Sequence, residues 1–217
     1  MNAYFEELDD FYKNRVPDHW NLSLEKQAET ARQDGEEAQR LLEEMTEVRA
    51  TIDIIVQDGQ DGQDEKSSHY HLNIDAGRMH AGQEGLRSPF LTLCHDRESF
   101  EVLREESGDS ILGFLGALAG QQDDLQLTPG RIRNLSGING TLSFQLTGEK
   151  PMTLEARFGD TESEEQTRCF VRLSRETFQD LKTGVIAPQD VFLNGLVEIE
   201  GDMQMAMQIA LAAVAPS

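Results

Sequence analysis

Positive charge is scarce in this sequence. Its 217 residues include 19 Lys and Arg against 40 Asp and Glu, which gives a formal net charge of -21 and a pI near 4.5. An acidic surface of this strength repels phosphate backbones and anionic lipid headgroups. We therefore expect no nucleic-acid partner.

Cysteine is scarce too, and the opening residues do not have the pattern that we expect of a secretory leader. Cys94 and Cys169 are the only cysteines, too few for a disulfide scaffold in a chain of this length. We expect both to be buried, unreactive thiols. The opening MNAYFEELDD is acidic where a signal peptide has a basic start and an apolar centre. These features favour a cytoplasmic protein.

Long apolar runs and the common catalytic motifs are also missing. The uncharged run 203–215 stops short of the roughly 20 apolar residues that span a bilayer, so we expect no integral membrane segment. No Gly-x-Ser-x-Gly elbow, phosphate loop, paired zinc-ligand cysteines or His-Glu-x-x-His occurs. We therefore predict no catalytic residue, no cofactor and no enzymatic activity; an enzyme subunit is a third reading, supported by fold analogy alone.

Two places in the sequence suggest a metal, and neither satisfies the requirements of a site. His69 and His71 alternate on a predicted strand, where His95 or Cys94 could join them, but no fourth ligand can be named. The loop 57–68 has acidic residues at every third position, which is not the alternating pattern of an EF-hand. Its acidic residues in that pattern are Asp58, Asp61 and Asp64. We predict no metal.

The first 47 residues have the pattern of helices. Apolar residues at three- and four-residue steps predict a helix from Phe5 to Val16 that Pro17 ends. The stretch 24–48 is rich in Glu, Gln and Ala, and Gly35 interrupts its apolar stripe. It predicts a second helix, or two short ones, with the charged residues on a solvated face. We expect 1–47 to form a helical N-terminal segment.

Strands begin at about residue 50, and the pattern then occurs twice. Short β-prone runs at 50–56, 69–75 and 89–93 predict three strands, the first two joined by the long polar loop 57–68. DRESFEVL at 96–103 returns as SRETFQDL at 174–181, and FLGAL at 114–118 returns as FLNGL at 192–196. TIDIIV at 51–56 likewise matches TLSFQL at 141–146.

These matches predict two copies of one unit, 48–133 and 134–217. Each copy has three strands and then a helix, opened by Asp96 or Ser174 as N-cap. The second copy continues with a strand, a Gly201-Asp202 turn and a Met-rich closing helix. The first copy is polar at this point, broken by Pro129 and Gly130, and has no such helix.

The segment TFQDLKTGVIAPQDVFLNGLVEIEGDMQMAMQI, 177–209, resembles the C-terminal half of the sterol carrier protein type 2 family. The shared features are a helix ending in Thr-Gly, a Pro-Gln pair, a Phe-Leu helix, a Gly-hydrophobic-Glu-Ile strand and a Gly-Asp-Met turn that opens a helix. The resemblance extends more weakly to Asn139 and, through the repeat, to Arg49. It implies an α+β fold, in which helices cover a twisted, mostly antiparallel sheet of five strands, here duplicated in tandem behind a helical N-terminal extension.

The resemblance also implies a hydrophobic tunnel between sheet and helices that accepts sterols, fatty acids, fatty acyl-coenzyme A or similar lipids. In the family the closing helix lines or gates this tunnel. From the residues alone, the narrow polar stripe of Gln204 and Gln208 predicts a helix buried on most sides, against either core or ligand. The predicted ligand-binding residues are Phe178, Leu181, Val185, Phe192, Leu193, Leu196, Met203, Met205, Ala206, Met207 and Ile209.

Two functions fit these observations. The first is a soluble carrier of a hydrophobic small molecule, with the tunnel in 134–217. The second is a non-catalytic accessory protein in which the cavity is filled and the acidic helical surface binds a protein partner. Exposed strand edges of small tandem units also allow a homodimer.

Overall fold

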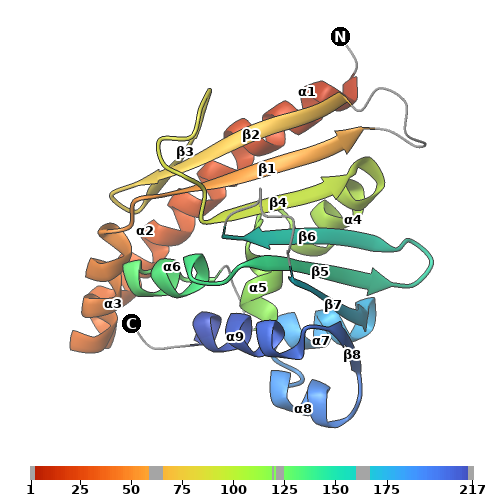
Figure 1. The fold of residues 1–217 in the computed structure, drawn as a ribbon. Helices are drawn as coiled ribbons and strands as arrows, with labels where there is room; N and C mark the ends of the chain where they lie inside the picture. Colours follow the sequence, from red (N-terminus) through yellow and green to blue (C-terminus); the bar gives the residue numbers. More distant parts are fainter. Residues whose placement is uncertain (1–2, 59–65, 119, 121–124, 160–166, 215–217) are drawn as a thin grey trace.

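The computed structural model describes residues 3–58, 66–118, 120, 125–159 and 167–214. Its helices and strands occur in runs along the chain, which is an α+β arrangement (Figure 1). The helices are α1 (Ala3–Asp10), the π-helix η1 (Phe11–Arg15), α2 (Val16–Asp34), α3 (Glu36–Thr46), α4 (Arg97–Ser107), α5 (Gly113–Leu118), α6 (Pro129–Ser136), α7 (Arg175–Lys182), α8 (Pro188–Leu193) and α9 (Met203–Val214). The strands are β1 (Ala50–Asp58), β2 (Lys66–Asp75), β3 (Arg78–Gly82), β4 (Leu91–Asp96), β5 (Gly140–Thr147), β6 (Met152–Phe158), β7 (Thr167–Ser174) and β8 (Val197–Gly201).

All of these strands belong to one mixed sheet of eight, in the order β3-β2-β1-β4-β6-β5-β7-β8. β1 and β4 pair in parallel, as do β5 and β7, and the other neighbours are antiparallel. The two halves of the chain join where β4 pairs with β6, with Leu91 opposite Phe158. The sheet is therefore larger than the five strands that the resemblance implied, because both halves contribute to it.

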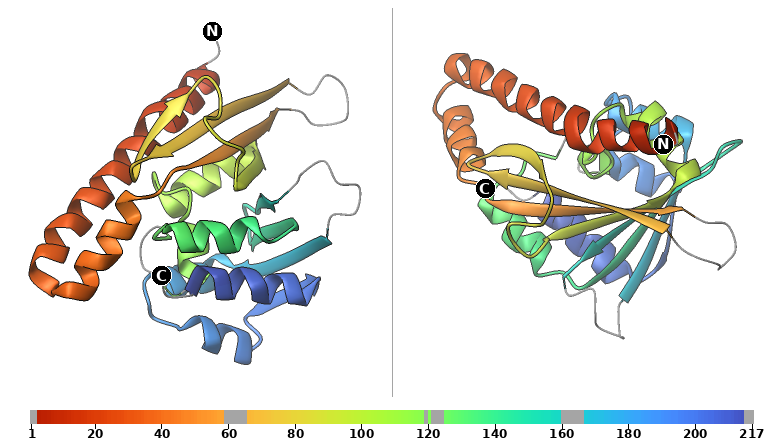
Figure 2. Two further views of the ribbon diagram at one scale, coloured as in Figure 1. Left: turned by 60° about the vertical axis from the view of Figure 1, so that its left-hand side comes forward. Right: turned by 90° about the horizontal axis from the view of Figure 1, so that it is seen from above.

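One face of the sheet is apolar and covered by helices. Along β6 the residues Met152, Leu154, Ala156 and Phe158 are buried and alternate with more exposed polar ones. On the covered face Phe144 of β5 lies 5.5 Å from the ring of Phe114 in α5 and 5.6 Å from the ring of Phe178 in α7. Helices α1 and α2 lie over one face of the strands of the first half (Figure 2). The inward-facing side chains of the strands and the apolar stripes of the helices pack together in a single core.

The N-terminal helices differ from the prediction at Pro17, which does not end the helix. The chain passes from α1 through η1 into α2, and the Val16 N–H donates to the carbonyl of Phe11, five residues back. Proline lacks an N–H and clashes with the carbonyl four residues earlier, and the wider π turn relieves that conflict. Gly35, with φ of 97°, then separates α2 from α3, so two helices form, which was one of the two predicted alternatives.

The predicted N-caps are confirmed. Asp96 Oδ1 accepts a hydrogen bond of 2.7 Å from the Ser99 N–H, and Ser174 Oγ accepts one of 3.0 Å from the Thr177 N–H. These bonds satisfy amide groups that the first turn of a helix leaves free. They fix where the chain turns from β4 into α4 and from β7 into α7.

Three further differences are local. The short edge strand β3 was not predicted; it follows a two-residue turn at Ala76 and Gly77, both with positive φ. Pro129 and Gly130 do not break the chain, because proline fits the first turn of a helix and Thr128 caps α6. The strand expected at 89–93 is β4, shifted to Leu91–Asp96. Most of the acidic loop, 59–65, lies outside the described residues.

The two halves have the same pairing pattern. β1 pairs antiparallel with β2 and parallel with β4, and β5 pairs antiparallel with β6 and parallel with β7. The halves differ in their outer pairings. β7 pairs with β8 and β2 pairs with β3 within one half, whereas β4 and β6 pair with each other between the halves. Duplication stays a prediction, and its expected boundary at 133/134 falls within α6.

Candidate functional site

Exposed apolar side chains gather in one part of the sequence. Nine large apolar side chains are exposed among the described residues, and seven of them lie between 185 and 211. These seven are Val185, Phe192, Leu193, Leu196, Met203, Met207 and Leu211. They belong to α8, α9 and the turns beside them, and we call them the C-terminal apolar surface. Exposed apolar groups of this size mark a ligand or partner site where they form a contiguous patch.

Helix α9 divides its apolar residues between two faces. Met203, Met207 and Leu211 follow at four-residue steps and are exposed, whereas Met205 and Ile209 are 3% and 4% exposed. Asp202 caps the helix, since its Oδ1 accepts a hydrogen bond of 2.9 Å from the Met205 N–H. The cap and the four-residue spacing together set which face points inward.

The inner face of α9 packs directly on the sheet. Met205 Sδ lies 3.6 Å from Thr167 Oγ1 at the start of β7. A Cβ added to Gly140, at the start of β5, would lie 2.7 Å from the same sulfur atom. Ile209 belongs to the same core as the sheet residues. This face of α9 is therefore in contact with protein along β5 and β7.

Helix α8 is attached to the core much more weakly. Val191 is its one buried residue, while Phe192 and Leu193 are 57% and 78% exposed. Elements with few buried apolar contacts open at low free-energy cost. Helix α8 is thus the part of the C-terminal apolar surface that can move most readily.

The structure divides the eleven predicted ligand-binding residues into two groups. Four are buried in the core: Phe178, Leu181, Met205 and Ile209. Ala206 is half-buried, and the other six are exposed: Val185, Phe192, Leu193, Leu196, Met203 and Met207. The expectation that α9 would be buried on most sides is wrong, because its outer face is open. The tunnel itself stays a prediction.

A pocket of about 190 Å³ adjoins the C-terminal apolar surface. It lies where β5 and β7 end and the turn from α8 into β8 passes. Its lining residues are Thr147, Arg172, Leu173, Ser174, Gly195, Leu196 and Glu198. Lipid-sized ligands occupy cavities of about 300–1,000 Å³, so this pocket has room for one end of such a molecule. Leu196 is the predicted residue that it contains.

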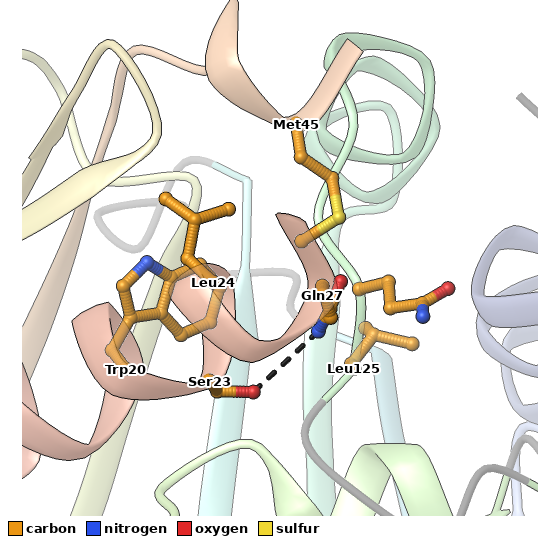
Figure 3. Close-up of a pocket in the computed structure, with 7 residues that line it drawn as sticks. Trp20, Ser23, Leu24, Gln27, Met45 and Leu125 are labelled. Atoms are coloured by element: carbon orange, nitrogen blue, oxygen red, sulfur yellow. Dashed lines mark hydrogen bonds between the residues drawn. The ribbon is translucent and has the colours of Figure 1, made fainter. Parts of the chain in front are cut away.

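A second pocket, far smaller, lies between α2, α3 and the segment before α6 (Figure 3). Its volume is about 10 Å³, and its lining residues are Trp20, Ser23, Leu24, Gln27, Met45, Leu125 and Gln126. Gln27 Nε2 donates across it to Ser23 Oγ at 3.5 Å. This space holds about one water molecule, so it is a packing gap.

Arg172 lines the larger pocket and was not among the predicted site residues. Its Nε donates to Gln145 Oε1 at 2.7 Å, and its Nη1 donates to Glu200 Oε2 at 2.9 Å. The same Nη1 lies 3.9 Å from Glu198 Oε2. Alternation along β7 and β8 was the available signal, because it places Arg172, Glu198 and Glu200 on one face.

The candidate metal ligands are not brought together. His71 Nδ1 pairs with Asp53 Oδ1 at 2.8 Å, and His69 pairs with Ser67 on the same strand. His95 is buried and contacts Tyr12, and burial lowers its pKa. Within the part of the chain that the structure describes, no group of three or more metal-ligating side chains occurs.

Both cysteines are buried, as predicted. Burial raises the pKa of the Cys94 thiol to about 11, and it also raises the pKa of Cys169. A raised pKa keeps a thiol protonated, and the thiolate is the reactive form. Neither cysteine is placed for nucleophilic chemistry.

Comparison with known proteins agrees with the sequence resemblance over part of the chain. Residues 124–213 match the model of the SCP-2 sterol transfer family. A solved structure of sterol carrier protein 2 from Yarrowia lipolytica, in its apo form, is 20% identical and aligns with 32% of this chain and 68% of that chain, with a TM-score of 0.26. No curated protein matches.

The family match begins within the first of the two expected copies and includes every residue of the C-terminal apolar surface. It leaves 1–123 outside, so it does not show a duplication. A search of the described helices finds none with the length and apolar content to cross a membrane.

Proposed function

We propose that residues 124–213 bind a hydrophobic small molecule, and that the protein acts as a lipid carrier and has no catalytic role. The observation that carries this proposal is the C-terminal apolar surface, which holds seven of the nine large apolar side chains exposed among the described residues. The match of this region to the SCP-2 sterol transfer family supports it. Exposed Leu and Phe side chains of this number cost free energy in water, and a bound lipid would remove that cost.

The ligand in this proposal lies under α8, between it and α9. Helix α8 is held by Val191 alone among its residues, so it can move aside at low cost and let Phe192 and Leu193 turn toward the ligand. Met203 and Met207 on α9 supply flexible thioethers that adapt to ligands of different shape. Of the eleven predicted residues, the six exposed ones can contact this ligand, and the buried four form the packed core behind them.

Binding of a fluorescent sterol such as dehydroergosterol tests this site. Leu193→Ser removes an exposed apolar side chain from α8, so we expect the affinity to fall about tenfold, as for a side chain contributing about 1.5 kcal/mol. Leu86→Ser is the matched control, because Leu86 is also exposed but lies before β4. Equal affinities of the two variants would reject this location.

A second function is supported by the packing of the core. Met205, Ile209, Phe178 and Leu181 are already buried against protein, which fits an accessory protein with a filled cavity and a protein partner. Native mass spectrometry separates the two functions. A lipid that co-purifies supports the carrier, and its absence together with no sterol binding supports the accessory protein.

We also propose that 48–133 and 134–217 are copies of one unit, the second of which keeps the ligand site. The shared pairing pattern and the two side-chain caps at Asp96 and Ser174 support this origin. An experimental structure in which β4 and β7 occupy unlike positions relative to β1 and β5 would contradict it.

A further inference from the structure

We propose that the site selects a lipid with an uncharged hydroxyl end over one with an anionic end, so that sterols and fatty alcohols bind better than fatty acids and acyl-coenzyme A. This inference rests on the proposed function and narrows its ligand class. It comes from the charges around the C-terminal apolar surface and from the bonding of Arg172 in the adjoining pocket.

The surface carries negative charge and no positive charge of its own. The stretch 184–214 contains Asp190, Glu198, Glu200 and Asp202 and has no Lys, Arg or His. Cations of the preceding helix α7 are engaged elsewhere: Lys182 Nζ donates to the carbonyl of Glu106 at 2.5 Å, and Arg175 Nε lies 3.3 Å from Glu106 Oε1. An anionic end group on this surface would meet like charges.

Arg172 is the cation of the pocket, and its Nε and Nη1 already donate to protein groups. It binds Gln145 and Glu200 directly and lies near Glu198, so one positive charge stands beside two negative ones. A fatty-acid carboxylate that approached the guanidinium would lie near these two carboxylates and be repelled by them. Arg168 lies at the other end of β7, roughly 13 Å away at about 3.3 Å per residue.

A hydroxyl end group meets better partners in the same pocket. A carboxylate accepts hydrogen bonds and cannot donate them, whereas a hydroxyl does both. Glu198 offers an acceptor, and Thr147 Oγ1, which donates to the Leu173 carbonyl at 3.4 Å, can still accept a hydrogen bond from a ligand hydroxyl. The volume of about 190 Å³ is enough for one polar end, with the apolar remainder lying along Leu196 and α8.

Competition by two ligands of equal chain length tests the selectivity. Oleate and oleyl alcohol differ in their end group, and each is used to displace dehydroergosterol from the full-length protein at constant pH and salt. The two ligands differ in solubility, so their affinities are not compared directly. For each protein we take the ratio of the oleate affinity to the oleyl alcohol affinity, and we then compare this ratio between variant and wild type.

The decisive variant is Glu198→Gln/Glu200→Gln, which frees Arg172 and removes two negative charges. We expect oleate to bind about tenfold tighter to it than to the wild type, with oleyl alcohol changing less than twofold. Glu98→Gln/Glu101→Gln removes the same charge from exposed positions of α4 and should leave the ratio unchanged.

Each outcome has a distinct meaning. An unchanged oleate affinity in the folded Glu198→Gln/Glu200→Gln protein overturns the selectivity, as does an equal gain in the α4 control. Binding of dehydroergosterol with no preference between the end groups also overturns it and leaves the carrier function standing. Failure of the wild type to bind any of the three probes rejects the carrier function itself.

Discussion

His95 illustrates how burial sets the state of a single side chain. Its Nδ1 lies 2.8 Å from the carbonyl oxygen of Asp96, which can only accept, so Nδ1 carries the proton of the neutral ring. Its Nε2 then accepts from the Tyr12 hydroxyl at 2.5 Å. Burial is the main cause that lowers the His95 pKa, and it outweighs the opposing effect of the Asp96 carbonyl.

The lowered pKa predicts a pH dependence of stability. The unfolded chain binds a proton at His95 near the ordinary value of about 6.5, and the folded chain does so at lower pH, so the free energy of unfolding falls as the pH drops below about 6.5. His95→Gln should reduce this fall by up to about 1.4 kcal/mol per pH unit. Urea unfolding at pH 7.5 and 5.5 measures it.

His80→Gln is the control, because His80 is exposed on β3. An identical loss of stability on acidification in the wild type and the His95→Gln protein would show that His95 does not govern this range.

Among the elements, α9 carries two different apolar faces on one helix. Met205 points to β5 and β7 and is buried, whereas Met207, two residues on, is 60% exposed. A methionine side chain stabilises the fold through the area that folding removes from water. Met205 and Met207 therefore contribute differently to the free energy of unfolding, although both are methionines of α9.

Truncation of each methionine tests this division. We expect Met205→Ala to lower the free energy of unfolding by about 2–4 kcal/mol, through lost burial and the cavity left behind. Met207→Ala should change it by less than about 0.5 kcal/mol, as for an exposed position. Equal losses in urea unfolding would mean that Met207 is buried in solution, by α8 or by a second copy of the chain.

The whole molecule is held together by the pairing of β4 with β6. This contact joins the two halves into one sheet, and one core includes residues from Leu8 in α1 to Ile209 in α9. Separate domains would each have a core of their own and would unfold independently. Neither half has that independence here.

Calorimetry tests whether the two halves unfold together. We expect a single thermal transition with equal calorimetric and van't Hoff enthalpies, because neither half can unfold without exposing the edge strand of the other. Two resolved transitions, with a midpoint for each half, would contradict a shared core.

Several elements could be predicted from the sequence because their signals are local. The strands near β1 and β2, the caps at Asp96 and Ser174 and the break at Gly35 depend on side chains within a few residues of each other. The family resemblance at 177–209 was local as well, and the match at 124–213 agrees with it. The passage through Pro17 was missed because a π turn leaves no simple spacing signal.

The sequence by itself thus determined most of the helices and strands, that the chain is acidic, and that residues 177–209 resemble the sterol carrier protein type 2 family. Only the tertiary structure decided that the two halves share one sheet, that Arg172 is held by Glu198 and Glu200, and which methionines face water. The physical reason is distance along the chain. Caps and alternation act between near neighbours, whereas burial depends on what residues far away in sequence place on top of a side chain.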